Sequence, residues 1–202
     1  MTLQTFQVTL GNEADEKKTA LRDRQHGCQP LKKSHFMTTY TCAVLTTSDQ
    51  GAKGKREDTS GPALRELLSE RGFTVTDHAL VADRIAEISR VLLEWIDRRK
   101  IDLVITTGGT GLTPGDVTPE ATRPLLEREI PGMAEAMRAA SLQKTPHAML
   151  SRALVGSRGR SLIINLPGSR QGALENLEVL LPTLPHALAK IKGSKEDCRP
   201  RG

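Results

Sequence analysis

Residues 101–120 read IDLVITTGGTGLTPGDVTPE, and this segment carries more structural information than any other part of the sequence. The apolar run at 103–105 is typical of a buried strand. It leads into a loop of glycines and threonines, then to a lone carboxylate at Asp116 and a helix start at Thr118 and Pro119. Many α/β proteins bind a phosphate with this order of strand, glycine-rich loop and helix, because glycines let an anion approach the backbone amides.

Asp116 indicates that this loop does more than hold an anion. A carboxylate repels a nearby phosphate unless a metal ion or a developing positive charge lies between them, so the stretch favours catalysis. It is not a Walker A loop, because no lysine lies between Lys100 and Lys144, and its glycines lack the G-x-G-x-x-G spacing. A simple connecting turn is the alternative. The four glycines and four threonines within residues 106–115 exceed what a turn requires.

The first half of the domain alternates between strand-like and helix-like segments. The expected elements are a strand at 41–46, a helix at 60–71, a strand at 73–80, a helix at 84–99 and the strand at 103–107. This order predicts an α/β fold with a parallel sheet and right-handed crossovers. The polar loops at 46–58 and 106–118 both leave the carboxyl ends of strands, where such sheets bind ligands, so we expect them to face one crevice.

The second half is less regular in pattern. We expect a helix at 119–128, a helix at 134–142, a hairpin of 153–155 and 161–166, a helix at 170–181 and a final helix at 186–192. Ser169 is expected to cap the helix that follows it.

Composition limits the class of protein. The 202 residues suit one domain, and because aromatic residues make up only 2%, the core must rest on aliphatic side chains. No apolar run is long enough to span a membrane, and the N-terminus lacks the apolar core of a signal peptide. The three cysteines, Cys28, Cys42 and Cys198, form neither a metal-binding spacing nor a disulfide framework. We therefore expect a cytoplasmic protein with no membrane partner.

The chain is basic, with a net charge of +5 and a pI near 9.3, and much of this charge lies near its two ends. RNA-binding proteins usually present stacking aromatics, whereas this chain has one Tyr, one Trp and three Phe. The charge is interpreted as favouring solubility and anionic small molecules, and nucleic acid is not an expected partner.

Residues 1–37 are expected to form a polar extension, and the sequence leaves open whether it is ordered. Two interpretations stand: translation starts at Met37, or the segment is part of a neighbouring domain. The domain itself is expected at 38–193, followed by a basic tail at 194–202.

Five motifs then resemble one known family. They are Asp58–Gly61, Thr106–Gly111, Gly115–Glu120, Ser151–Ala153 and Leu166–Ser169. In order and spacing these resemble the MogA/MoaB-like molybdopterin adenylyltransferases of molybdenum cofactor biosynthesis, which also occur as a domain of gephyrin. The resemblance covers about residues 38–193 and implies a three-layer α/β/α fold with a mostly parallel central sheet.

The resemblance implies a reaction as well: molybdopterin and ATP, with Mg²⁺, give adenylylated molybdopterin and pyrophosphate. A MoeA-type enzyme then inserts molybdate. Members form trimers, and some form hexamers. A non-catalytic relative that binds molybdopterin or serves as a scaffold is the alternative. We favour the enzyme because both acidic site residues, Asp83 and Asp116, are present.

The resemblance assigns Asp83 and Asp116 as catalytic residues, which would also hold the Mg²⁺ that accompanies ATP. The substrate-binding residues that it implies are Ser48, Asp49, Thr107, Gly108, Gly109, Thr110, Gly111, Glu120, Ser151, Pro167, Gly168 and Ser169. Structural roles compete for some of these positions: Asp83 as a helix N-cap, and Ser48 with Asp49 as turn residues. Asp58 and Ser60 are expected to cap the helix that follows them, with direct contact to substrate as the alternative.

The remaining candidates are cationic or imidazole side chains. Arg152, Arg158 and Arg160 are weaker candidates for contact with ATP phosphates, and the favoured interpretation is that they are solvated surface arginines. The family often has a lysine shortly after the Leu166–Ser169 motif. In this chain Arg170 follows that motif and is the candidate to replace the lysine's contact with phosphate. The histidines His78, His147 and His186 form no cluster with a carboxylate or cysteine, so no catalytic role is expected of them.

Overall fold

The computed structural model describes residues 39–195. The whole of the expected N-terminal extension, 1–37, and most of the expected tail, 194–202, lie outside the described residues, as do Cys28 and Cys198.

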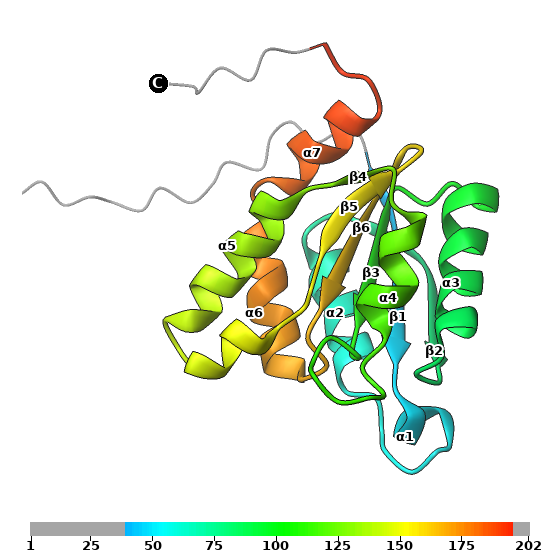
Figure 1. The fold of residues 1–202 in the computed structure, drawn as a ribbon. Helices are drawn as coiled ribbons and strands as arrows, with labels where there is room; N and C mark the ends of the chain where they lie inside the picture. Colours follow the sequence, from blue (N-terminus) through cyan, green and yellow to red (C-terminus); the bar gives the residue numbers. More distant parts are fainter. Residues whose placement is uncertain (1–38, 196–202) are drawn as a thin grey trace, which may run out of the picture. The chain divides into compact units, whose positions relative to one another are not determined.

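A six-stranded mixed sheet, in the order β2-β1-β3-β6-β5-β4, forms the centre of the described residues (Figure 1). Its strands are β1 (Thr41–Thr47), β2 (Thr74–Val81), β3 (Leu103–Thr107), β4 (Arg128–Glu129), β5 (Val155–Arg158) and β6 (Ser161–Leu166). The four strands β2, β1, β3 and β6 run parallel, β5 is antiparallel to β6, and β4 is antiparallel to β5. The predicted parallel sheet is thus confirmed, with a short antiparallel edge.

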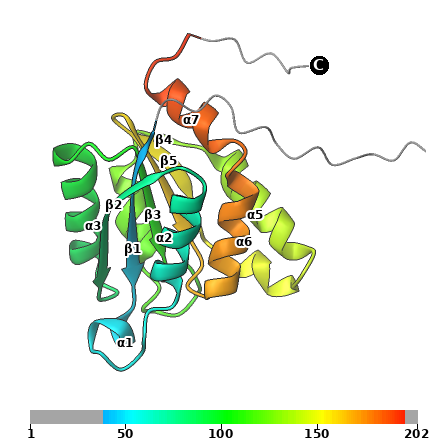
Figure 2. The ribbon, with the colours of Figure 1, turned by 180° about the vertical axis from the view of Figure 1, so that it is seen from behind.

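Helices cover both faces of this sheet (Figures 1 and 2). Leu103 and Ile105 of β3 point to one face and Val104 to the other, because side chains alternate along a strand. The first face packs against α2 (Ser60–Glu70), α5 (Pro131–Leu142), α6 (Arg170–Leu180) and α7 (Leu184–Ile191). The second packs against α3 (Ile85–Leu93) and α4 (Thr118–Thr122). The expected three-layer α/β/α fold is confirmed.

Two predicted helices are interrupted. The helix expected at 84–99 is α3 followed by a π-helical turn, η1 (Glu94–Arg98). The helix expected at 119–128 ends as α4 and continues as a 3₁₀ turn, η2 (Arg123–Leu125), before β4. Pro124 explains the second break, because its ring cannot donate a backbone hydrogen bond and clashes with the preceding helical turn.

Other boundaries also shift. Helices α5 and α7 begin earlier than predicted, each with a proline in the first turn. Strand β5 runs to Arg158, which pairs with Ser161, so the hairpin turn is two residues long. Short helices α1 (Asp49–Ala52) and η3 (Pro146–Leu150) occupy segments expected to be loops.

The core is aliphatic, as the composition predicts. Its largest fully buried side chains are leucines, isoleucines and one methionine. Cys42 lies in this core as a free thiol, and burial raises its pKa to about 12. Among the described residues, no helix is long and apolar enough to cross a membrane.

Candidate functional site

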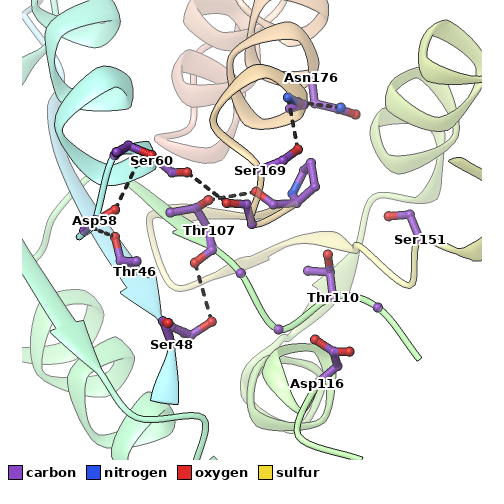
Figure 3. Close-up of a pocket in the computed structure, with 18 of the residues that line it drawn as sticks. Thr46, Ser48, Asp58, Ser60, Thr107, Thr110, Asp116, Ser151, Ser169 and Asn176 are labelled. Carbon is purple, nitrogen blue, oxygen red and sulfur yellow. Dashed lines mark hydrogen bonds between the residues drawn. The ribbon is translucent and has the colours of Figure 1, made fainter. Parts of the chain in front are cut away.

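A pocket of about 720 Å³ opens where the parallel strands β1, β2, β3 and β6 end (Figure 3). Thr47, Leu80, Thr107 and Pro167, which lie at or next to these strand ends, contribute to the pocket wall. The two polar loops predicted to share a crevice do meet here, since the pocket is lined from both. The parallel register explains this, because it brings the carboxyl ends of the strands to one edge.

The glycines after β3 let three backbone segments come together. Gly108 and Gly109 have positive φ angles of 104° and 61°, a conformation that other residues rarely adopt. A Cβ on Gly108 would lie 2.3 Å from the Thr47 carbonyl oxygen, and a Cβ on Gly168 would lie 3.2 Å from the Gly108 Cα. Side chains at these positions would therefore fill or distort the loop that faces the pocket.

Helix α6 begins at the same place. Ser169 caps it, as predicted, by accepting a hydrogen bond from the Gly172 amide at 3.3 Å. The turn that precedes it is held by two hydroxyls: Thr107 Oγ1 donates to the Pro167 carbonyl at 2.8 Å, and Ser60 Oγ donates to the Gly168 carbonyl at 2.8 Å (Figure 3). A helix N-terminus and the glycine loop together form an electropositive surface for an anion.

Asp83 lies beside the glycine loop, and Asp49 holds it there. Its Oδ2 accepts from the Asp49 amide at 2.8 Å, while the Asp83 amide donates to Asp49 Oδ1 at 3.2 Å. Its Oδ1 is buried without a hydrogen-bond partner and lies 3.3 Å from where a Cβ on Gly109 would stand. Burial raises the pKa of Asp83, and the negative charges of Asp49 and Asp116 raise it further, whereas the Asp49 amide and the nearby Thr47 hydroxyl lower it.

The competing role of Asp83 as an N-cap is not observed. The N-cap position of α3 is Arg84, and α3 has no side-chain cap. Burying a carboxylate oxygen without a hydrogen-bond partner costs stability. The presence of such an oxygen at Asp83 therefore favours a role in binding a ligand of the pocket over a role in capping α3.

Asp116 reaches the pocket from the far arm of the same loop (Figure 3). Its Oδ2 accepts from the amide and the hydroxyl of Thr113, at 2.7 and 2.6 Å. Gly111 leaves room for this carboxylate, since a Cβ there would lie 3.0 Å from Asp116 Oδ2. The glycine loop, which carries no ionisable side chain from Gly108 to Gly111, is therefore flanked in the pocket by two carboxylates.

All but two of the predicted site residues line this pocket. The lining ones are Ser48, Asp83, Thr107, Gly108, Gly109, Thr110, Gly111, Asp116, Ser151, Pro167, Gly168 and Ser169. The two that do not line the pocket are Asp49, which donates its backbone amide to Asp83, and Glu120, which forms an ion pair with Arg152. Ser48 also has the turn role considered for it, because it caps α1 by accepting from the Gly51 amide at 3.0 Å.

Asp58 caps α2, as predicted. Its Oδ1 accepts from the amides of Ser60 and Gly61 at 3.1 and 2.9 Å, and its Oδ2 accepts from Thr46 Oγ1 at 2.6 Å. Ser60 does not act as a cap, because its hydroxyl is committed to the Gly168 carbonyl.

The three candidate arginines do not point at a phosphate site. Arg152 donates to the carbonyls of Gly111 and Asp116 and to Glu120. Arg158 binds Asp97 and the Leu125 carbonyl. It lies at the end of β5, beside the amino ends of the parallel strands and so at the opposite end of the sheet from the pocket, and Arg160 follows it in the hairpin turn. Arg158 and Arg160 therefore lie away from this pocket, because the hairpin carries them to the opposite ends of the strands.

Sequence reasoning missed the part of the pocket between α5 and α6. Polar residues line it: Arg138, Ser141, Thr145, His147, Glu175 and Asn176. Asn176 Nδ2 donates to Ser141 Oγ at 3.1 Å and joins the two helices. A signal was present in the sequence, because Ser169, Gly172 and Asn176 recur at helical spacing and place small and polar residues on one face of α6.

No group of three or more His, Cys, Asp and Glu side chains suited to a metal ion occurs in residues 39–195. Two carboxylates, Asp83 and Asp116, are the acidic groups at the glycine loop. Such a pair suits Mg²⁺ that arrives with a nucleotide, since Mg²⁺ commonly takes one or two carboxylates and completes its shell with phosphates and water.

The fold and this pocket define the class: an α/β protein with a glycine-rich loop and two carboxylates at the carboxyl ends of its parallel strands. Comparison with known proteins narrows the class. The family model described as "Probable molybdopterin binding domain" matches residues 43–186. The chain therefore belongs to the MogA/MoaB family of molybdopterin-binding domains of molybdenum cofactor biosynthesis.

Individual relatives agree with this assignment. The chain is 42% identical over 160 residues to molybdopterin adenylyltransferase from Helicobacter pylori strain J99, which covers 78% of this chain and 91% of that protein. It is 43% identical over 167 residues to gephyrin from Dictyostelium discoideum, covering 78% of this chain but only 23% of gephyrin. The crystal structure of the molybdopterin biosynthesis enzyme MoaB from Thermus thermophilus superposes with a TM-score of 0.74 at 52% identity, covering 77% of this chain and 98% of that one.

Proposed function

We propose that this protein is a molybdopterin adenylyltransferase, which transfers AMP from ATP to the terminal phosphate of molybdopterin. One observation carries the proposal: the buried, unpartnered Oδ1 of Asp83 lies beside the glycine loop, with Asp116 on the other arm of that loop. A site that only stored an anion would gain nothing from two carboxylates near it. The name of the H. pylori relative supports the same reaction.

The transfer needs no protein nucleophile. An oxygen of the molybdopterin phosphate attacks the α-phosphorus of ATP and forms a new phosphoanhydride bond. The bond between the α-phosphorus and the oxygen that bridges to the β-phosphate breaks, and pyrophosphate leaves with that oxygen and its electron pair. Because the attacking phosphate is already anionic, no proton must be removed, and the protein has to supply position and charge stabilisation.

The chain offers groups for both tasks. The Gly109 amide and the N-terminus of α6 at Ser169 are suited to the molybdopterin phosphate, whereas the Gly108 amide donates to the Leu166 carbonyl at 3.2 Å and keeps the loop against β6. Asp83 and Asp116 are suited to hold Mg²⁺ with ATP. This ion would screen the repulsion between the two phosphates and between them and the carboxylates.

The family suggests the assembly and the next step in the pathway. We propose that the chain forms a homotrimer, with a hexamer as the alternative, and that a MoeA-type enzyme takes up the product. Sedimentation velocity would distinguish a trimer or hexamer of the 22.0 kDa chain from a monomer, which would overturn the assembly proposal.

The test is an assay of wild-type protein with ATP, Mg²⁺ and molybdopterin, beside Asp116→Ala. We expect adenylylated molybdopterin and equal pyrophosphate from the wild type. The variant should lose at least about 10²-fold in rate, because a group that organises transition-state charge is removed. Binding of molybdopterin to the variant, followed by fluorescence, should persist and show that the pocket is intact.

Glu178→Gln provides the matched control, since Glu178 is an exposed carboxylate of α6 outside the pocket wall. Its rate should equal that of the wild type. If the wild type binds molybdopterin but transfers no AMP, the protein is a non-catalytic binding or scaffold relative and the proposal is wrong.

A further inference from the structure

Between Gly111 and Asp116 the loop has no buried apolar side chain, although Val117, which follows Asp116, packs against the core. Leu112, the one large apolar side chain between Gly111 and Asp116, is 63% exposed. The bonds that Asp116 makes with Thr113 are local and tie the loop to itself. The end of the loop is held by Val117 in the core and by the Thr118 amide, which donates to the Gly109 carbonyl at 3.0 Å, so the stretch from Gly111 to Asp116 needs a further contact if Asp116 is to keep one position.

Arg152 supplies that contact from the segment between η3 and β5. Its Nε donates to the Gly111 carbonyl at 2.7 Å, its Nη2 to the Asp116 carbonyl, and its Nη1 to Glu120. Its backbone amide also donates to the Thr110 carbonyl at 3.0 Å. One residue thus bonds to the start, the far arm and the end of the segment 110–120.

The acceptors explain why this residue is an arginine. A guanidinium holds five N–H donors in one rigid plane and can serve several acceptors at once, whereas a lysine ammonium acts as a single point of charge. The ion pair with Glu120 is partly solvated, with side chains 34% and 45% exposed, so the two carbonyl contacts are expected to matter more.

We propose that Arg152 is a positioning residue: it fixes the Asp116 loop, residues 110–120, and thereby places the Asp116 carboxylate at the pocket. This inference rests on the proposed function for the role of Asp116. Arg152 does not line the pocket and bonds to carbonyls and Glu120 rather than to the Asp116 carboxylate, so it acts through the loop and not on substrate.

The first experiment does not depend on activity. Hydrogen–deuterium exchange of the loop amides is measured in wild type, Arg152→Lys and Arg152→Met. We expect exchange in 110–120 to rise at least about tenfold in both variants, while the β-sheet amides stay protected. Unchanged exchange in the loop would overturn the proposal.

Arg158→Lys is the matched control. Arg158 likewise spreads its guanidinium over a carboxylate, Asp97, and a carbonyl, that of Leu125, but at the opposite edge of the sheet. This variant should leave exchange in 110–120 and AMP transfer unchanged. If it loosened the loop as much as the Arg152 variants do, the effect would be a general loss of stability and the proposal would fail.

A double-mutant cycle then tests whether Arg152 acts through Asp116. Arg152→Met should lower the rate of AMP transfer at least about tenfold in the wild-type background, and less than about twofold when Asp116 is already alanine. Equal losses in both backgrounds would contradict the proposal. If the wild type transfers no AMP, the proposed function fails, and the exchange experiment still decides the role of Arg152 in the loop.

Discussion

The carboxyl group of Asp83 lies beside the glycine loop with one oxygen bonded to the Asp49 amide and the other buried without a partner. Burial and the charges of Asp49 and Asp116 raise its pKa. The fold therefore favours the protonated form of this group and bears a cost when the group is charged. This contribution to stability is present below the pKa of the unfolded carboxyl and is lost as the pH rises through the higher folded pKa.

Asp83→Asn should separate stability from function. At pH 7 the free energy of unfolding of the variant should equal or exceed that of the wild type, because the variant removes the charge and keeps an acceptor for the Asp49 amide. The difference should shrink below about pH 4, where the wild-type carboxyl also becomes neutral. Urea unfolding at both pH values measures this.

AMP transfer by Asp83→Asn should nevertheless fall at least about 10²-fold. A variant that is less stable than the wild type at neutral pH, with a gap that persists in acid, would show that Asp83 is a structural carboxylate.

A substitution at Gly109 tests the backbone geometry of the glycine loop. Gly109→Ala introduces a side chain at φ 61°, with its Cβ 2.4 Å from Thr118 Oγ1. We expect a loss of about 1–3 kcal/mol in the free energy of unfolding and a loss of transfer activity. Gly132→Ala is the control, because nothing lies within 4 Å of a Cβ at that position in α5, and it should be neutral or slightly stabilising. Equal behaviour of the two variants would contradict the geometry assigned to the loop.

At the level of single residues, the sequence predicted what the local chemistry dictates. Ser169 caps its helix, and Asp58 binds the first amides of α2, because such side chains satisfy free amides wherever a helix begins. The contacts of Arg152 and Asp49 were not predictable. Both bind groups more than 30 residues away, and only the folded chain brings these together.

At the level of elements, helix α2 is tied to the sheet by Asp58. This carboxylate bonds to two amides of the helix and to Thr46 at the end of β1. Asp58→Ala should therefore lower the free energy of unfolding by about 1–2 kcal/mol, through loss of the cap and of the Thr46 bond. Chemical denaturation measures the loss.

Ser69→Ala serves as the comparison for α2, since Ser69 makes an exposed bond to the Arg65 carbonyl of its own helix. It should change stability by less than about 0.5 kcal/mol. If Asp58→Ala were equally mild, Asp58 would not hold the helix to the sheet.

Helices and strands were predictable where the hydrophobic period of the sequence and the capping or turn residues indicate the same bounds. Strands β1, β3 and β6 and helices α2 and α6 lie within a residue or so of their predicted bounds. The errors occur where tertiary contacts decide. Gly156 interrupts the apolar pattern of β5, yet a strand forms, because the missing side chain lets the Arg128 carbonyl come within 2.6 Å of where a Cβ would stand.

At the level of the whole molecule, the parallel order of the sheet predicted that two distant loops would share one edge, and they do. The sequence did not reveal that α5 and α6 extend the pocket beyond that edge. This wall is made of polar residues from both helices, among them Ser141 and Asn176, and it depends on how the helices pack on the sheet. Its polar character is suited to a ligand larger than a phosphate group.

The assignment of this pocket to AMP transfer is tested by a single turnover with molybdopterin, Mg²⁺ and ATP labelled at either the α- or the γ-phosphorus. Transfer of AMP predicts that the α-label enters the molybdopterin product while the γ-label leaves entirely as pyrophosphate. Transfer of the γ-label to molybdopterin, or of neither label while molybdopterin is bound, would contradict the assignment of this pocket to adenylyl transfer.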